Sequence, residues 1–129
     1  MVKTFLVEKD FNEGEALIKE LDEANFDVHA ALWLYESESE YWRLIIASEV
    51  VDTHGARKAY EQINDIINQS GDLKSINLMD ITAWSPKHPL IKSLRSVIQT
   101  SPKEITDIRF SRKTIDNTFI DDAYIYRMQ

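Results

Sequence analysis

Residues 28–51 read VHAALWLYESESEYWRLIIASEVV, and this stretch decides the fold. Two apolar runs, rich in aromatic and aliphatic side chains, flank the polar tetrapeptide SESE at residues 37–40. Apolar runs of this length on either side of a short polar loop are typical of a β-hairpin. We therefore predict two antiparallel strands that are joined at residues 37–40.

The register of the predicted hairpin makes both of its faces apolar. We place Glu36 opposite Tyr41 across the loop. Leu32 then faces Ile45 on one side of the sheet, while Trp33 lies on the other side. A sheet with one face in water alternates apolar with polar residues, and neither face here does so for more than a residue or two. We expect the strands to lie in the middle of a sheet, with each face covered by helices, a partner chain or a ligand.

Helical periodicity predicts a first helix before the hairpin. Asn12 is a good N-cap, and Glu15 follows at the capping-box position. Asn25 is suited to end the helix in the left-handed conformation, and Gly14 weakens its first turn. The predicted buried face consists of Leu17, Ile18, Leu21 and Ala24.

Two further helices are predicted after the hairpin. The second begins at Asp52 or Thr53 and is stopped by Gly71. The third carries Pro89 in its first turn and is ended by Pro102. Their predicted buried faces are Ala56, Ala59, Tyr60, Ile63, Ile66 and Ile67 in the second helix, and Leu90, Ile91, Leu94, Val97 and Ile98 in the third.

Three more strands complete the predicted sheet. We expect them at residues 76–84, with Asp80 in the middle, at 105–112 and at 118–127, the last two paired with each other. The order of elements is then α-β-β-α-β-α-β-β. This order indicates one α+β domain over residues 1–129, with three helices packed on a mixed five-stranded sheet.

The composition is that of an ordinary globular chain. It has 129 residues, 43% of them hydrophobic, and no cysteine. A chain without cysteine has no disulfide framework, no thiolate nucleophile and no cysteine-bound metal. No apolar run is long enough to span a bilayer, and the amino-terminal residues lack the apolar core of a signal peptide. We expect a cytoplasmic protein that uses no cofactor and binds no membrane.

Charge is divided unevenly along the chain. The net charge is −7, which disfavours general nucleic-acid binding. Residues 1–85 carry seven basic and seventeen acidic residues, whereas residues 86–113 carry seven basic and two acidic ones. The basic segment is either a solvated surface or a surface for an anionic partner, such as single-stranded nucleic acid or the acidic part of a second subunit. Its candidate anion-binding residues are Lys103, Arg109, Arg112 and Lys113.

Known catalytic motifs are missing, so catalysis would depend on carboxylates in strands. The chain has no phosphate-binding glycine loop, no nucleophile elbow and no paired-histidine zinc spacing. Asp80, Asp121 and Asp122 fall in predicted strands, where acidic residues are depleted. If the third and fifth strands were neighbours, Asp80 and one of the other two would meet at a divalent cation such as magnesium. Alternatively, each acid lies near a strand end, pairs with an arginine or caps a turn.

Arg43 is the fourth candidate for chemistry. It lies between Trp42 and Leu44 in the hairpin, and a partly buried arginine favours a carboxylate partner. One of the three strand aspartates would supply that partner in a structural pair. In the catalytic alternative, Arg43 stabilises negative charge that develops during hydrolysis.

The aromatic residues of the hairpin have two interpretations. Trp33, Tyr35 and Trp42 are either packed in the core or form an interface, where tryptophan and tyrosine dominate binding energy. We take them as interface candidates because one sheet face carries more apolar area than three helices comfortably cover.

The stretch ALWLYESESEYWRLIIASEVVDTHGARKAYEQI, followed late in the chain by DDAYIYRM, resembles a family of small bacterial proteins of similar length. That family has no established activity, so the resemblance implies a bacterial cytoplasmic setting and no substrate or catalytic residue. The residues that carry it are Trp33, Tyr35, Trp42, Arg43, Ala47, Ser48, Gly55, Ala59, Tyr60, Ala123, Tyr124, Tyr126 and Arg127.

The sequence thus favours a small interaction or regulatory module without catalytic activity, which binds a protein partner or forms a homodimer. One alternative is a metal-dependent hydrolase or nuclease that uses the strand aspartates. Another alternative is a protein that binds single-stranded nucleic acid through residues 86–113.

Overall fold

The structure is a computed structural model that describes residues 4–73 and 76–129. Within that part of the chain, a mixed five-stranded sheet has the strand order β3-β2-β1-β5-β4, which confirms the predicted α+β class. The elements are α1 (Glu8–Glu23), β1 (Ala30–Glu36), β2 (Tyr41–Ala47), α2 (Glu49–His54), α3 (Ala56–Gln69), η1 (Gly71–Leu73), η2 (Leu78–Asp80), β3 (Ile81–Trp84), α4 (Pro89–Arg95), β4 (Ile108–Ile115) and β5 (Thr118–Met128).

The hairpin has the predicted register and the predicted position. Glu36 pairs with Tyr41, and Leu32 pairs with Ile45. β1 is the central strand, with antiparallel β2 on one side and antiparallel β5 on the other, and β2 pairs in parallel with β3. Both hairpin strands are therefore interior strands, as their two apolar faces indicated.

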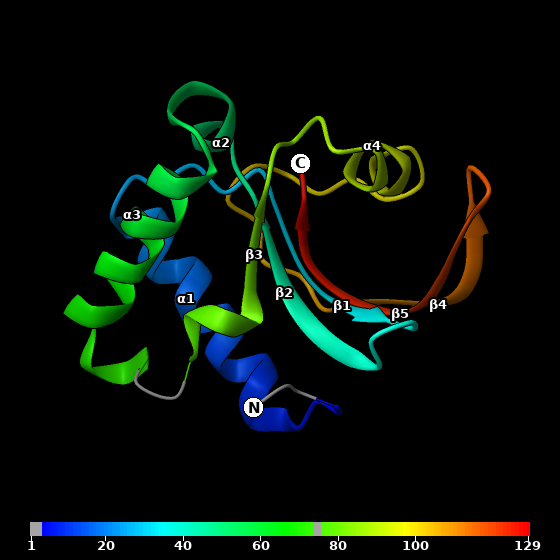
Figure 1. The fold of residues 1–129 in the computed structure, drawn as a ribbon, viewed down its shortest axis with the longest axis horizontal. Helices are drawn as coiled ribbons and strands as arrows, with labels where there is room; N and C mark the ends of the chain where they lie inside the picture. The colour runs from blue at the N-terminus through cyan, green and yellow to red at the C-terminus, as the bar shows by residue number, and fades with distance from the viewer. Residues whose placement is uncertain (1–3, 74–75) are drawn as a thin grey trace.

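Helices cover both faces of the sheet (Figure 1). Trp33 and Leu44 pack in one core beneath α1 and α3, while Leu32 and Ile45 pack in a second core with α4. The hairpin of β4 and β5 bends toward α4, so the second core lies on the concave side of the sheet (Figure 1).

A β-bulge in β5 turns two consecutive side chains to the same face. Ala31 pairs with Arg127 and Leu32 pairs with Ile125, so Tyr126 is an extra residue on β5. An inserted residue interrupts the alternation of side chains and bends the strand. As a result, Tyr126 and Arg127 both contact α1.

Both edges of the sheet are protected. At β3, the backbone N–H of Ala83 donates to the hydroxyl of Tyr60 on α3 at 2.9 Å. At β4, the edge carries Arg109, Arg112 and Lys113, and Arg112 has a φ of 51°, which interrupts regular strand geometry. Cationic side chains and local kinks on an edge strand oppose pairing with another chain.

The amino-terminal helix begins earlier than predicted. α1 starts at Glu8, because the carboxylate of Asp10 accepts a hydrogen bond from the N–H of Val7 at 2.9 Å and caps the helix there. Asn25 has a φ of 60°, in agreement with the predicted helix end. The predicted face of Leu17, Ile18 and Leu21 is fully buried, whereas Ala24 is exposed.

The predicted second helix is in fact two helices. Ser48 caps α2 by accepting from the N–H of Val50 at 3.1 Å, so the helical segment starts before Asp52. Gly55, with a φ of 88°, separates α2 from α3. Of the residues predicted to be buried, Ala59, Ile63 and Ile67 are buried, while Ala56 is exposed.

The predicted strand at residues 76–84 is shorter than expected. Its first half forms the turn η2, because the side chain of Asn77 accepts from the N–H of Met79 at 2.9 Å. Asp80 therefore lies at the end of a turn and not inside a strand.

The last helix and β4 also differ from their predicted bounds. α4 ends at Arg95, well before Pro102, and Val97 is 57% exposed. β4 runs over Ile108–Ile115 instead of 105–112. The preceding segment still accompanies β5, because Thr106 N–H donates to the carbonyl of Tyr126 at 2.6 Å.

Candidate functional site

A groove opens on the concave side of the sheet, between the tips of the two hairpins and α4 (Figure 1). We call it the tip groove. It has a volume of about 460 Å³, which lies in the size range of ligand-binding clefts. It is lined by residues 34–39 of the β1–β2 hairpin, residues 118–120 of β5 and Leu90 of α4.

The tip groove combines apolar walls with an acidic rim. Leu34 and Ile120 are buried in its floor, whereas Phe119 is 58% exposed. Glu36 and Glu38 contribute their carboxylates to its lining. Large exposed aromatic side chains beside charged groups are the usual composition of a protein-binding surface.

A second hollow, of about 600 Å³, lies between α3 and residues 76–78. Its lining includes the amide residues Asn64, Asn68 and Asn77.

The three candidate carboxylates do not meet. β3 and β5 are separated in the sheet by β2 and β1, so the condition for a site shared by Asp80 and β5 is not fulfilled. Asp122 instead forms a two-pronged ion pair with Arg109, at 2.6 and 2.7 Å. Asp121 accepts a hydrogen bond from the hydroxyl of Ser37 at 3.2 Å. Among the described residues, no three histidine or carboxylate side chains are grouped in a way that would hold a metal ion.

Arg43 binds neutral oxygens. Its guanidinium donates to the hydroxyl of Thr82, to the hydroxyl of Tyr41 at 3.3 Å and to the carbonyls of Met79 and Ile81 at 3.4 and 3.2 Å. These bonds tie β2 to β3 and to the turn before it. The strand aspartates predicted as its partners are not among the acceptors of these bonds.

The predicted interface aromatics lie mostly inside the molecule. Trp33 is 4% exposed and Trp42 is 6% exposed, because α1 and neighbouring side chains cover this face. Tyr35 is half-buried against the ring of Trp42 and also lines the tip groove. Of the three, Tyr35 alone offers surface to a partner.

The four candidate anion-binding residues are spread over the molecule. Lys103 lies 3.8 Å from the carboxylate of Asp22, near the end of β5, and Arg109 is engaged by Asp122. The hydrogen bond from Arg109 to Asp122 is the main reason that the pKa of Arg109 is raised. Arg112 and Lys113 are exposed on β4 near the beginning of β5.

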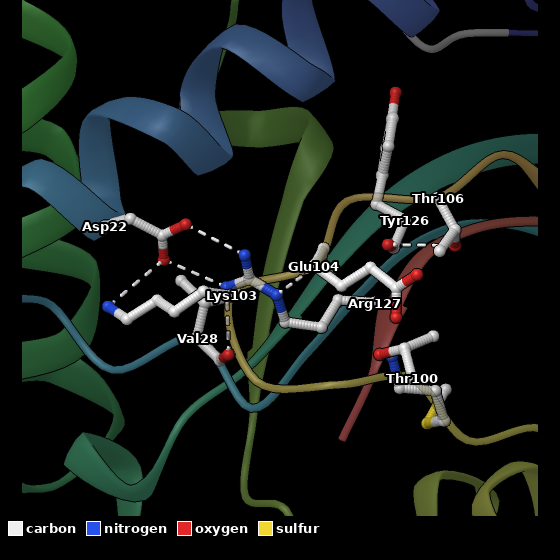
Figure 2. Close-up of polar contacts among 9 residues, drawn as sticks. Asp22, Val28, Thr100, Lys103, Glu104, Thr106, Tyr126 and Arg127 are labelled. Carbon is white, nitrogen blue, oxygen red and sulfur yellow. Dashed lines mark hydrogen bonds and ion pairs between the residues drawn. The ribbon is translucent and has the colours of Figure 1, made fainter.

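Sequence reasoning missed the most constrained polar contact, the ion pair between Arg127 and Asp22 (Figure 2). Arg127 is 1% exposed, and its guanidinium donates to both carboxylate oxygens of Asp22, at 2.9 and 2.8 Å. It also donates to the carbonyl of Glu104 at 2.9 Å and to that of Val28 at 3.3 Å. The available signal was an arginine inside the apolar run AYIYRM. Four of its five N–H groups donate to internal acceptors and the side chain is 1% exposed, so Arg127 organises the fold.

A second internal contact surrounds the hydroxyl of Tyr126. This hydroxyl accepts from the indole N–H of Trp33 at 3.0 Å and donates to the carbonyl of Phe11 at 2.8 Å. Burial raises the pKa of Tyr126 well above its ordinary range. The tyrosine is therefore a neutral structural donor and does not act as a base.

Near α4, the ring of His88 stacks on Trp84 at a centroid distance of 3.6 Å. Its Nδ1 accepts from the N–H of Leu90 at 3.2 Å and so caps α4. Burial lowers the pKa of His88, in keeping with this acceptor role. His88 thus fixes the start of the helix that supplies one wall of the tip groove.

Comparisons with protein-family models, with curated proteins and with solved structures found no match to this chain. The resemblance to a bacterial family therefore stays an expectation from the sequence. In the described part of the chain, none of the helices has both the length and the apolar character that crossing a membrane requires.

Proposed function

We propose that this protein is an interaction module without catalytic activity, and that it binds a protein partner through the tip groove. The observation that supports this most is the exposure of Phe119 at the mouth of an apolar groove with carboxylates at its rim. Such a combination provides both buried area and electrostatic selection. The setting we propose is the bacterial cytoplasm, as the sequence resemblance implies.

The construction of the groove supports a binding role. Its walls come from β1, β5 and α4 together with the β1–β2 loop at residues 37–39, and the hydroxyl of Ser37 donates to the carboxylate of Asp121 on the other hairpin at 3.2 Å. A site on such elements is preorganised, so less conformational entropy is lost when a partner binds.

The experiment compares what the immobilised protein retains from a lysate of its source cells. Three chains are used: the native protein, Phe119→Ser in the groove and Met79→Ser as control. Met79 is 74% exposed on η2, so the control removes a similar exposed apolar side chain from another surface. We expect the native protein and the control to retain one common protein that Phe119→Ser does not.

Two outcomes of this experiment would contradict the proposed function. Identical sets of retained proteins for all three chains would overturn the proposal. Retention of nucleic acid in place of protein would also overturn it and would favour the basic segment at residues 86–113. Unchanged melting temperatures would show that both serine variants are folded.

A further inference from the structure

We propose that the occupant of the tip groove is a cationic segment of another protein, which places a lysine or arginine beside a large apolar side chain. This inference rests on the proposed function and names the chemistry of the partner. It follows from the charges at the rim, from the apolar surface between them and from the features that oppose a second copy of the chain.

The rim of the groove is acidic and its carboxylates are available. Glu36, Glu38 and Glu40 belong to the β1–β2 hairpin, and among the described residues none of the three takes part in an ion pair. On the adjacent β4–β5 hairpin, Asp121 accepts a hydrogen bond from the hydroxyl of Ser37 and adds its charge beside this rim. Clustered like charges at a concave surface raise the local concentration of oppositely charged partners.

The apolar part of the groove is the reason why we expect the partner to carry an apolar side chain as well as a cation. Among the residues that line the groove, Phe119 is largely in water, while Leu34 and Ile120 are almost fully buried. A partner gains most by covering Phe119 and Leu90, because removing exposed apolar area from water is favourable. A polycation without apolar side chains would satisfy the rim and leave this surface exposed.

A second copy of the chain fits the groove less well. Each chain carries a net charge of −7, so two acidic rims would repel one another. Pairing of two β4 edges would bring Arg109, Arg112 and Lys113 opposite cations of the same kind. The β3 edge is closed by Tyr60. These features oppose a homodimer that joins two rims or two sheet edges, and they favour a partner of opposite charge in the groove.

The test uses a short labelled peptide in which lysine and leucine are interspersed with serine, and fluorescence anisotropy as the readout. A matched peptide has glutamate in place of each lysine, and a second has serine in place of each leucine. The native protein is compared with Glu36→Lys/Glu38→Lys. The control variant is Glu23→Lys/Asp65→Lys, which changes net charge equally at exposed acids of α1 and α3.

We expect the lysine–leucine peptide to bind the native protein and the control with similar affinity. Binding to Glu36→Lys/Glu38→Lys should be about tenfold weaker or more, since two attractive contacts become repulsive. Both matched peptides should bind more weakly, and added salt should weaken the lysine–leucine complex.

Two results would overturn the inference. One is equal binding of the lysine and glutamate peptides. The other is a native dimer in sedimentation that Phe119→Ser or Glu36→Lys/Glu38→Lys dissociates, because the occupant would then be a second copy. If the lysate retention still depends on Phe119, the proposed function stands while this inference falls. If that retention does not depend on Phe119, the proposed function itself falls.

Discussion

Tyr126 and Arg127 follow one another in β5, yet both side chains contact α1. Tyr126 donates to the carbonyl of Phe11, and Arg127 binds the carboxylate of Asp22. In a regular strand, consecutive side chains point to opposite faces. The bulge at Tyr126 removes this alternation, so β5 is fastened to the helix at two points.

The first prediction concerns the contribution of the ion pair between Arg127 and Asp22 to stability. Arg127→Met should lower the free energy of unfolding by about 3–5 kcal/mol, because it leaves the Asp22 carboxylate and two carbonyls without their donor. Lys103→Met removes an exposed cation from the same carboxylate and should cost less than about 1 kcal/mol. Urea unfolding measures both variants. Equal losses would show that the buried contact has no special weight.

The second prediction concerns the loss of stability when a side chain is added at Gly14. A Cβ at Gly14 would lie 2.3 Å from the hydroxyl oxygen of Tyr126, so Gly14→Ala should destabilise the protein by about 1–3 kcal/mol despite the better helix propensity of alanine. Tyr126→Phe in the same background should recover part of the loss, since it removes the nearest atom. Gly71→Ala, with no atom within 4 Å of its Cβ, is the control in thermal unfolding. A stabilised Gly14→Ala variant would contradict this packing.

Alkaline pH should weaken the fold through Tyr126. The unfolded chain releases tyrosine protons near pH 10, while burial raises the pKa of Tyr126 in the folded chain. The stability from this hydroxyl is fully present below about pH 10 and is lost as the pH rises toward the folded pKa. Urea unfolding between about pH 9 and pH 11 should show a shallower decline for Tyr126→Phe than for the native protein. Parallel declines would place the alkaline sensitivity elsewhere.

Tyr60→Phe tests the protection of the β3 edge. Without the hydroxyl, the N–H of Ala83 loses its acceptor, and we expect a loss of about 1–2 kcal/mol. The amide of Ala83 should then exchange with solvent deuterium faster, which NMR measures directly. Tyr35→Phe is the matched control, because no hydroxyl hydrogen bond of Tyr35 occurs within the described chain. An unchanged exchange rate at Ala83 would show that the edge is protected by another group.

The hairpin could be predicted down to its register because a local pattern encodes it. The polar loop and the apolar runs on each side fix which residues pair, and the two apolar faces require an interior position. The tip groove was not foreseen, since it depends on how far β4 and β5 bend relative to α4. That bend comes from tertiary packing and has no local signature.

The errors have specific physical causes. The sequence predicts a strand over residues 76–84 with Asp80 in its middle, but the Asn77 side chain holds a turn in the first half of this segment. The site shared by Asp80 with Asp121 or Asp122 required neighbouring strands, and strand order depends on long-range contacts that the pattern of a single segment does not contain. The partner of Arg127 lies 105 positions away, beyond the reach of spacing arguments.

The hydrogen bond between Tyr60 and β3, together with the cations and the kink of β4, bears on how readily the protein aggregates in the cell. Its central hairpin has the apolar, β-prone composition from which fibrils grow, and growth needs an open strand as a template. The hydrogen bond to Tyr60 and the kink at Arg112 oppose such pairing at the two ends of the native sheet. We therefore expect the folded protein to resist amyloid conversion, and local opening of β3 to weaken that resistance.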